Sequence, residues 1–265
     1  ADNAVVNLND QKFSEKSHDP DYIGPLRGQV WLTIQTRQAQ QLVRGRKGGE
    51  GKHTIIGLVG FADRLRVIWL AARNDEPYAD WWLIKVHEAI TATAESLQQW
   101  QAEMDDHLQR SSAIQATLAE STKPYRMPLQ FANPYAYQGA NLLSAYDNLI
   151  RTVLTARHIG LMDNLSSKDM IQAAGRKIRS TFTIPQGYRF LNISRTSLQT
   201  ADEKRDKARQ LMGEIPPEVL SGERQAPIMP RKVQFPAGYS KRLASQPEMT
   251  PTKPARTDIQ NDDDS

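Results

Sequence analysis

The sequence predicts a mainly α-helical protein, in which one strand and two helices near the N-terminus are continued by a helical bundle with a small β-hairpin. Three observations support this class. Apolar residues recur at spacings of three and four through most of residues 54–179. A short alternating segment precedes them at 29–35. The two ends of the chain are polar, and the C-terminal one is rich in proline, a composition typical of segments without a core of their own.

The alternating segment predicts a strand that buries one face. Val30, Leu32 and Ile34 point in one direction, because successive side chains of a strand point to opposite faces. The other face carries Gln29, Trp31, Thr33 and Gln35.

Two helices are expected to follow the strand. Thr36 is an N-cap candidate for a short helix over Arg37–Arg44, and Gly45 stands where a C-cap glycine belongs. A second helix is expected to open at Thr54 and to run to about Arg73.

The remainder of the chain predicts a helical bundle. Its helices are expected over about 79–110, 137–158 and 164–179, with a last one, preceded by a capping box, that ends near Gly213. The helix at 79–110 carries a heptad-like seam, which favours a face of an intramolecular bundle over a coiled coil. Residues 111–136, with three prolines, are expected to form a loop. The segments 182–184 and 188–193 are expected to form the hairpin.

These elements divide the chain into four parts. Residues 1–24 are expected to be a flexible arm, and residues 25–75 the strand and its two helices. Residues 76–222 are expected to form the helical domain with its hairpin. Residues 223–265 are expected to be a mostly disordered or surface-draped tail.

Composition excludes several classes of protein. The chain has no cysteine, which removes disulfides, thiolate metal sites and a cysteine nucleophile. No apolar run approaches the roughly 20 residues that a membrane span needs, and no signal peptide is recognised, so no membrane contact and a cytoplasmic location are expected. The net charge of +4 points to nucleic acid only where the basic residues cluster.

Catalytic and metal-binding patterns are also missing. His87-Glu88 begins like a zinc-protease motif, but Thr91 stands where the second histidine is needed. The five histidines are scattered, and no nucleophile elbow or carboxylate cluster is present. We therefore expect no enzyme, no metal and no cofactor.

The basic loop at Arg44–His53 is the clearest candidate site. It differs from a nucleotide-binding P-loop, because Arg46 replaces the first glycine of that motif and His53 replaces its final Ser or Thr. Phosphate groups of DNA are the alternative ligand, since a helix start offers free N–H groups to an anion. The residues expected to hold phosphates are Arg37, Arg44, Arg46, Lys47, Lys52, His53 and Thr54. A solvated basic loop without a ligand is an equally plain interpretation of the charge alone.

The order of the elements favours the DNA interpretation. Strand, short helix, loop and longer helix is the order of the ribbon-helix-helix module, in which one strand per chain pairs with its twin in a homodimer. The resulting ribbon enters the major groove of double-stranded DNA. In that arrangement Gln29, Trp31, Thr33 and Gln35 would read base edges. The alternative is a strand that pairs inside its own chain, with 182–184 or 188–193.

Several segments of the chain also resemble a known family. They are Pro77–Leu83, Pro128–Tyr135, Tyr146–Leu149, Leu154–Leu161 and Met212–Leu220. Over roughly residues 25–231 the chain is similar to the AcaB-type transcriptional regulators of integrating conjugative elements and large conjugative plasmids. The matching segments are spread along the chain and encode no known chemistry.

The resemblance implies a regulator that activates transfer genes through a ribbon-helix-helix DNA-binding part. It locates no contact residue, so the contacts named above rest on alternation and charge. The expected partners are promoter DNA, a second copy of the chain and, as a further contact, RNA polymerase. The alternative function is a non-enzymatic accessory protein of the conjugation apparatus that does not bind DNA.

Overall fold

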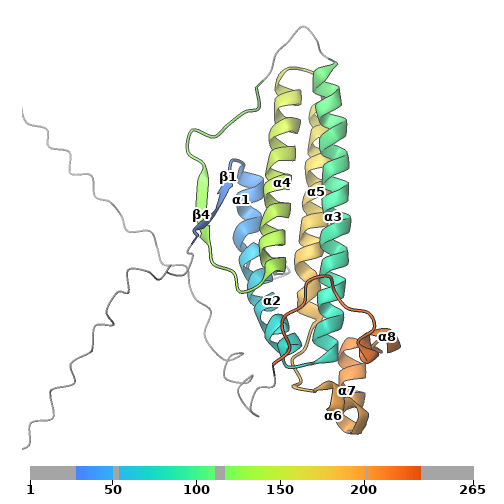
Figure 1. Ribbon diagram of the computed structural model, residues 1–265. Helices are drawn as coiled ribbons and strands as arrows, with labels where there is room; N and C mark the ends of the chain where they lie inside the picture. Colours follow the sequence, from blue (N-terminus) through green and yellow to red (C-terminus); the bar gives the residue numbers. More distant parts are fainter. Residues whose placement is uncertain (1–27, 50–53, 111–116, 201, 234–265) are drawn as a thin grey trace, which may run out of the picture.

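Long helices packed side by side form the body of the protein (Figure 1). The computed structural model describes residues 28–49, 54–110, 117–200 and 202–233. The helices are α1 (Arg37–Arg44), α2 (Leu58–Arg73), α3 (Pro77–Gln109), α4 (Pro134–His158), α5 (Asn164–Thr183), the 3-10 turn η1 (Ile184–Gly187), α6 (Arg195–Thr200), α7 (Asp202–Met212) and α8 (Pro217–Ser221). The strands are β1 (Val30–Ile34), β2 (Gly45–Arg46), β3 (Ile55–Ile56) and β4 (Tyr125–Leu129). The predicted mainly α class is confirmed.

The heptad-like seam of α3 faces the inside of the bundle. Leu83, Val86, Ile90, Leu97 and Met104 are buried, and α3 packs on both α4 and α5. One continuous hydrophobic core joins these helices to α1, α2 and β1. The seam therefore serves an intramolecular bundle, as predicted. No helix in the described ranges is both long enough and apolar enough to cross a membrane.

Proline marks the start of two long helices. Pro77 and Pro134 each occupy the first turn of their helix, where the missing N–H group costs no hydrogen bond. Asn133 caps α4 by accepting a hydrogen bond from the backbone N–H of Ala136 at 3.0 Å. The sequence-based boundary at 137 was late because Pro134 was interpreted as a loop residue.

β1 pairs within its own chain, but with a segment that the sequence analysis assigned to a loop. β1 and β4 form an antiparallel two-stranded sheet in which Trp31 lies opposite Pro128 and Thr33 opposite Arg126. Proline is tolerated in β4 because, among the described residues, this strand has a neighbouring strand on one side only. The strand pairs neither with 182–184 nor with 188–193.

The hairpin predicted at 182–193 is wrong. Residues 182–183 complete α5, Pro185 lies in the 3-10 turn η1, and residues 188–194 form no strand. Helix α5 continues beyond Arg179 because the buried Phe182 ring stacks on Phe61, with ring centroids 4.8 Å apart. The apolar residues that suggested a strand, Tyr188 and Ile193, contact the core individually.

The chain from α8 onward returns across the bundle as a strap, residues 223–233 (Figure 1). Ala226 of this strap is buried, and the backbone N–H of Ile228 donates to the hydroxyl of Tyr135 at 3.2 Å. Lys232 Nζ contacts both carboxylate oxygens of the buried Asp80 at 2.8 Å. This part of the predicted tail is draped on the surface. Residues 234–265 and the N-terminal residues 1–24 lie outside the described residues.

A buried carboxyl at the start of α3, Glu76, should make stability depend on pH. Burial raises the pKa of Glu76 from 4.5 to about 8. The folded protein thus holds a proton that the unfolded chain releases above pH 4.5, so the free energy of unfolding falls as pH rises from 4.5 to about 8. The slope contributed is about 1.4 kcal/mol per pH unit. In Glu76→Gln this contribution disappears, and chemical denaturation near pH 5 and near pH 8 should show a smaller difference than in the wild type. An equal difference in both proteins would contradict the prediction.

Candidate nucleic-acid interface

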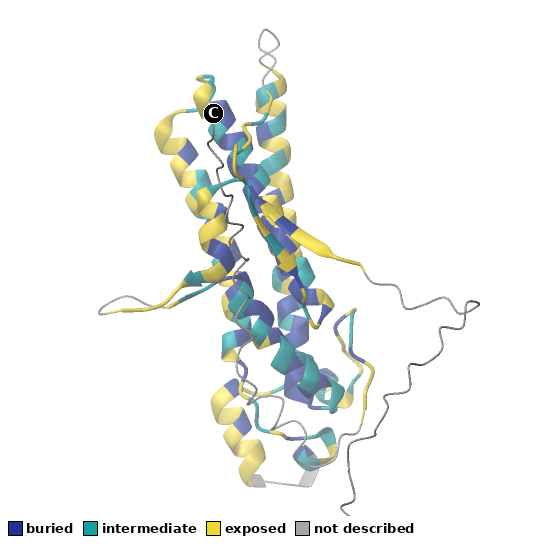
Figure 2. Ribbon diagram, turned by 90° about the vertical axis from the view of Figure 1, so that its left-hand side faces the viewer, coloured by how far each residue is buried: buried dark blue, intermediate teal, exposed yellow. Residues whose placement is uncertain are grey.

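We call the two-stranded β1–β4 sheet the ribbon. Its outward face is exposed along one side of the bundle (Figure 2). Leu32, Ile34 and Leu129 point into the core, whereas Gln29, Thr33 and the 47% exposed Trp31 face solvent. The alternation predicted for β1 is therefore confirmed from Trp31 to Ile34. Val30, expected to be buried, is 47% exposed; it is the first residue of β1 and lies opposite the buried Leu129.

β4 adds two outward residues that the sequence analysis missed. Arg126 and Pro128 are exposed beside Thr33 and Trp31 respectively. The guanidinium carbon of Arg126 lies 5.2 Å from the ring centroid of Trp31, a cation–π distance. Pairing between segments almost a hundred residues apart leaves no local signal, so only the three-dimensional fold brings these side chains together.

Gln35, the fourth predicted base-reading residue, lies in the junction between β1 and α1. Its side chain is half-buried, and Oε1 accepts a hydrogen bond from the backbone N–H of Ser121 at 2.9 Å. The carboxamide thereby holds the segment that precedes β4, whereas Gln29, Trp31 and Thr33 remain on the solvent side.

Asp147 of α4 fixes this junction. Its buried carboxylate accepts hydrogen bonds from the backbone N–H groups of Gln35 at 2.9 Å and Thr36 at 2.8 Å. It also accepts one from the Thr36 hydroxyl at 2.6 Å. Thr36 Oγ1 in turn accepts from the N–H of Ala39 at 3.3 Å, which confirms the predicted N-cap. The direction of α1 relative to the ribbon is set by these bonds.

α1 places two arginines beside the end of the ribbon. Arg37 and Arg44 are the first and last residues of α1. Both are exposed and line a polar hollow of about 430 Å³. The rest of its lining is Gln40, Gln41, Gly45 and Tyr125. The hollow therefore extends from α1 to β4, and its charged side chains are both basic.

The basic loop is carried by a small two-stranded base rather than by a helix start. β2 and β3 pair antiparallel, and the resulting arm projects from the bundle (Figure 2). Arg46, Lys47 and Thr54 are exposed on the described part of the arm; Lys52 and His53 lie outside the described residues. Thr54 Oγ1 accepts a hydrogen bond from the N–H of Gly48 at 3.1 Å, which joins the two described sides of the arm.

The prediction that a helix begins at Thr54 is wrong, because α2 begins at Leu58 with Gly57 as its N-cap. Gly45 and Gly57 set this boundary. Gly45 has a φ of 72°, and a Cβ there would lie 2.0 Å from the carbonyl oxygen of Ile55. A Cβ at Gly57 would lie 2.3 Å from the nitrogen of Gly45. The two glycines let the base of the arm close, and the helix starts only after it.

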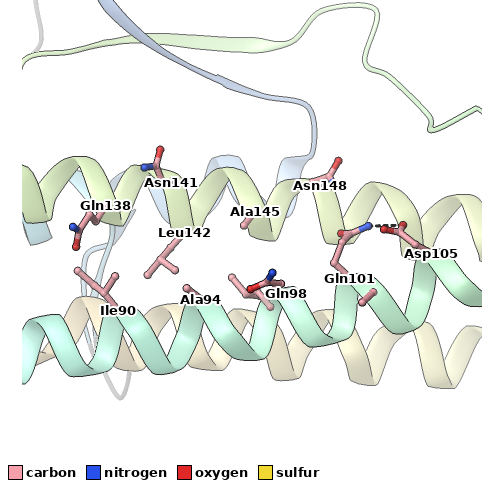
Figure 3. A pocket seen from close by; sticks show the side chains of 12 residues that line it. Ile90, Ala94, Gln98, Gln101, Asp105, Gln138, Asn141, Leu142, Ala145 and Asn148 are labelled. Carbon is pink, nitrogen blue, oxygen red and sulfur yellow. Dashed lines mark hydrogen bonds between the residues drawn. The ribbon is translucent and has the colours of Figure 1, made fainter.

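A second hollow runs between α3 and α4 (Figure 3). This groove has a volume of about 570 Å³. It is lined by Ile90, Ala94, Leu97, Gln98, Gln101, Ala102, Asp105, Gln138, Asn141, Leu142, Ala145 and Asn148. Its one charged residue, Asp105, accepts a hydrogen bond from Gln101 Nε2 at 2.8 Å. The groove is thus almost uncharged, with small residues and amides.

The described part of the chain contains no group of three or more His, Cys, Asp or Glu residues that could hold a metal ion. His87, which suggested the comparison with a zinc motif, instead packs edge-on against the ring of Tyr135, with ring centroids 6.2 Å apart.

The fold and this surface define a mainly helical protein with a two-stranded ribbon, a basic helix beside it and a basic arm. Comparison with known proteins names the class: the model of the transcriptional regulator AcaB matches residues 22–232, and the chain belongs to that family. The fold is also similar to the crystal structure of selenomethionine-containing AcaB from uropathogenic E. coli, with a TM-score of 0.52 and 16% identity. That likeness covers 74% of this chain and 95% of the other. No curated protein sequence matches.

Proposed function

We propose that this transcriptional regulator binds double-stranded DNA through the ribbon and the basic surface beside it. The main supporting observation is that the exposed face of the ribbon has α1 at one end, and that Asp147 fixes the junction between β1 and α1. The major groove of DNA is wide enough to admit a two-stranded ribbon, and base edges are read there. Gln29, Trp31 and Thr33 would then face the bases.

The basic residues would hold the phosphates on either side of the groove. Arg37 and Arg44 line the hollow next to Tyr125, at one end of the ribbon. Arg46 and Lys47 extend the positive surface onto the arm. Lys52 and His53, assigned to phosphates from the sequence alone, lie outside the described residues. Contacts of this kind supply affinity and orientation without sequence information.

The regulated genes and the sign of regulation are proposed from the resemblance described above. We infer an activator of transfer genes on a conjugative plasmid or integrating element that acts in the cytoplasm, with RNA polymerase as a further contact. We propose that this task involves no metal and no organic cofactor. The activity proposed is binding, without catalysis.

We also infer a homodimer, but one formed through a surface other than the ribbon. β1 already has its partner β4, so dimerisation does not have to supply the second strand. The groove between α3 and α4 suits two identical chains, because an isologous contact must be complementary to itself. Amide side chains such as Gln98, Gln138 and Asn141 both donate and accept hydrogen bonds, and a nearly uncharged face avoids like-charge repulsion. A monomer by light scattering at micromolar concentration would contradict this inference.

The experiment that tests the proposed function is capture of fragmented plasmid and chromosomal DNA by the native protein, followed by sequencing. We expect enrichment of a limited set of promoter fragments, with affinity that falls steeply as salt rises because phosphate contacts release counterions. Absence of DNA binding at low salt would refute the proposal. It would favour the alternative of an accessory protein of the conjugation apparatus, for which the groove between α3 and α4 is the available docking surface.

A further inference from the structure

The second strand of the ribbon comes from the same chain and brings a different set of outward side chains. Where two identical chains would present the same residues twice, β1 presents Trp31 and Thr33 and β4 presents Pro128 and Arg126. Thr33 and Arg126 are directly opposite each other, so they reach the same depth in any groove that the ribbon enters. The outward surface of the ribbon is therefore chemically asymmetric, because one chain supplies two different strands.

Arg126 is the one charged side chain in the two strands and their flanking residues 29 and 35. It is exposed and has no hydrogen bond or ion pair with other described residues. Its described contact is with Trp31, 5.2 Å from the ring centroid. A cation–π contact uses the charge and leaves the N–H donors of the guanidinium available.

We propose that Arg126 determines the base specificity of this ribbon by selecting guanine, and that Trp31 is the residue that positions it. This inference rests on the proposed DNA-binding function. A guanidinium donates two parallel hydrogen bonds to O6 and N7 of guanine, the commonest specific contact in the major groove. The aromatic ring restricts an otherwise flexible side chain, so less conformational freedom is lost on binding.

The test is selection of preferred sequences from a random DNA library by the full-length wild type and by Arg126→Ala. The wild type should require guanine at one or more positions of its site. Arg126→Ala should lose discrimination at such a position by about 5- to 150-fold and keep the preferences at the others. Arg126→Lys should keep part of the guanine preference, because Lys also donates to O6 and N7.

The matched control is Lys123→Ala, which removes one exposed positive charge three residues before Arg126. This variant should weaken binding to all sequences without changing any base preference. Trp31→Ala should reduce the same guanine preference, and Trp31→Phe should restore much of it. An unchanged preference in Arg126→Ala, with affinity lowered as in the control, would assign Arg126 to phosphates and overturn the proposal. A wild type that binds no DNA would refute the proposed function itself.

Discussion

Replacing Asp147 with Ala is expected to destabilise the fold by about 3 kcal/mol and to abolish specific DNA binding together with it. The carboxylate is only 4% exposed and accepts three hydrogen bonds from Gln35 and Thr36. Removing it leaves two backbone N–H groups without their acceptor, and unsatisfied buried donors are costly. The same bonds set the direction of α1 relative to the ribbon, so both halves of the proposed interface lose their alignment.

Thermal denaturation and DNA binding, measured on the same samples, check this expectation. For a chain of this size the melting temperature should fall by roughly 6–12 °C. Asp147→Asn keeps one carbonyl acceptor and should lie between the wild type and the alanine variant. Asp169→Ala, an exposed carboxylate on α5, is the control and should change stability by no more than about 0.5 kcal/mol. A stable Asp147→Ala protein with normal binding would show that the junction does not orient the interface.

Replacing Arg37 and Arg44 together with Ala should weaken binding to every DNA sequence by roughly 30-fold near physiological salt. These arginines are exposed on α1 at the end of the ribbon and line the same hollow. If each contacts a phosphate, the loss of two contacts should lower the slope of log affinity against log salt by about 1.8. Because phosphates carry no sequence information, the preferred site should stay the same.

The matched control removes two positive charges from the other end of the molecule. Lys204 and Lys207 are exposed on α7, which lies far from β1 and β4 in Figure 1. Lys204→Ala with Lys207→Ala should leave the salt slope unchanged, although the net charge changes by the same amount. Equal effects of the two double variants would mean that only the overall charge matters and that α1 has no specific role.

Local patterns in the sequence predicted the first strand and helix closely. Each of these signals depends on residues close together in the sequence. The structure contains the alternation from Trp31 to Ile34, the N-cap at Thr36 and the C-cap at Gly45. The seam of α3 was equally readable, because a long helix repeats its signal many times. Features of this kind need no knowledge of distant partners.

The partner of the first strand could not be predicted in this way. β4 is short, contains Pro128 and follows Pro124, which locally favours a loop. Its identity as a strand depends on a pairing with β1 that is almost a hundred residues distant in sequence. For the same reason Arg126 was absent from the predicted site. The hairpin at 182–193 was predicted for a different reason: Tyr188 and Ile193 are apolar because they are buried, although residues 188–194 form no strand.

The most direct test of a DNA-reading ribbon made by one chain is a disulfide between its two strands. Val30 and Leu129 are opposite each other in the antiparallel register, and such pairs lie within the range that a disulfide spans. The chain has no cysteine of its own, so Val30→Cys with Leu129→Cys introduces the only pair of thiols. The reduced double variant serves as the control for the loss of the two apolar side chains.

The measurement is electrophoresis of the oxidised variant without reductant, together with its affinity for the preferred DNA site. We expect a covalently closed single chain that binds this site with the affinity and salt slope of the reduced variant. A covalent dimer would show that the strands pair between chains. An oxidised protein that loses binding and regains it on reduction would show that the ribbon must open or exchange its partner to read DNA.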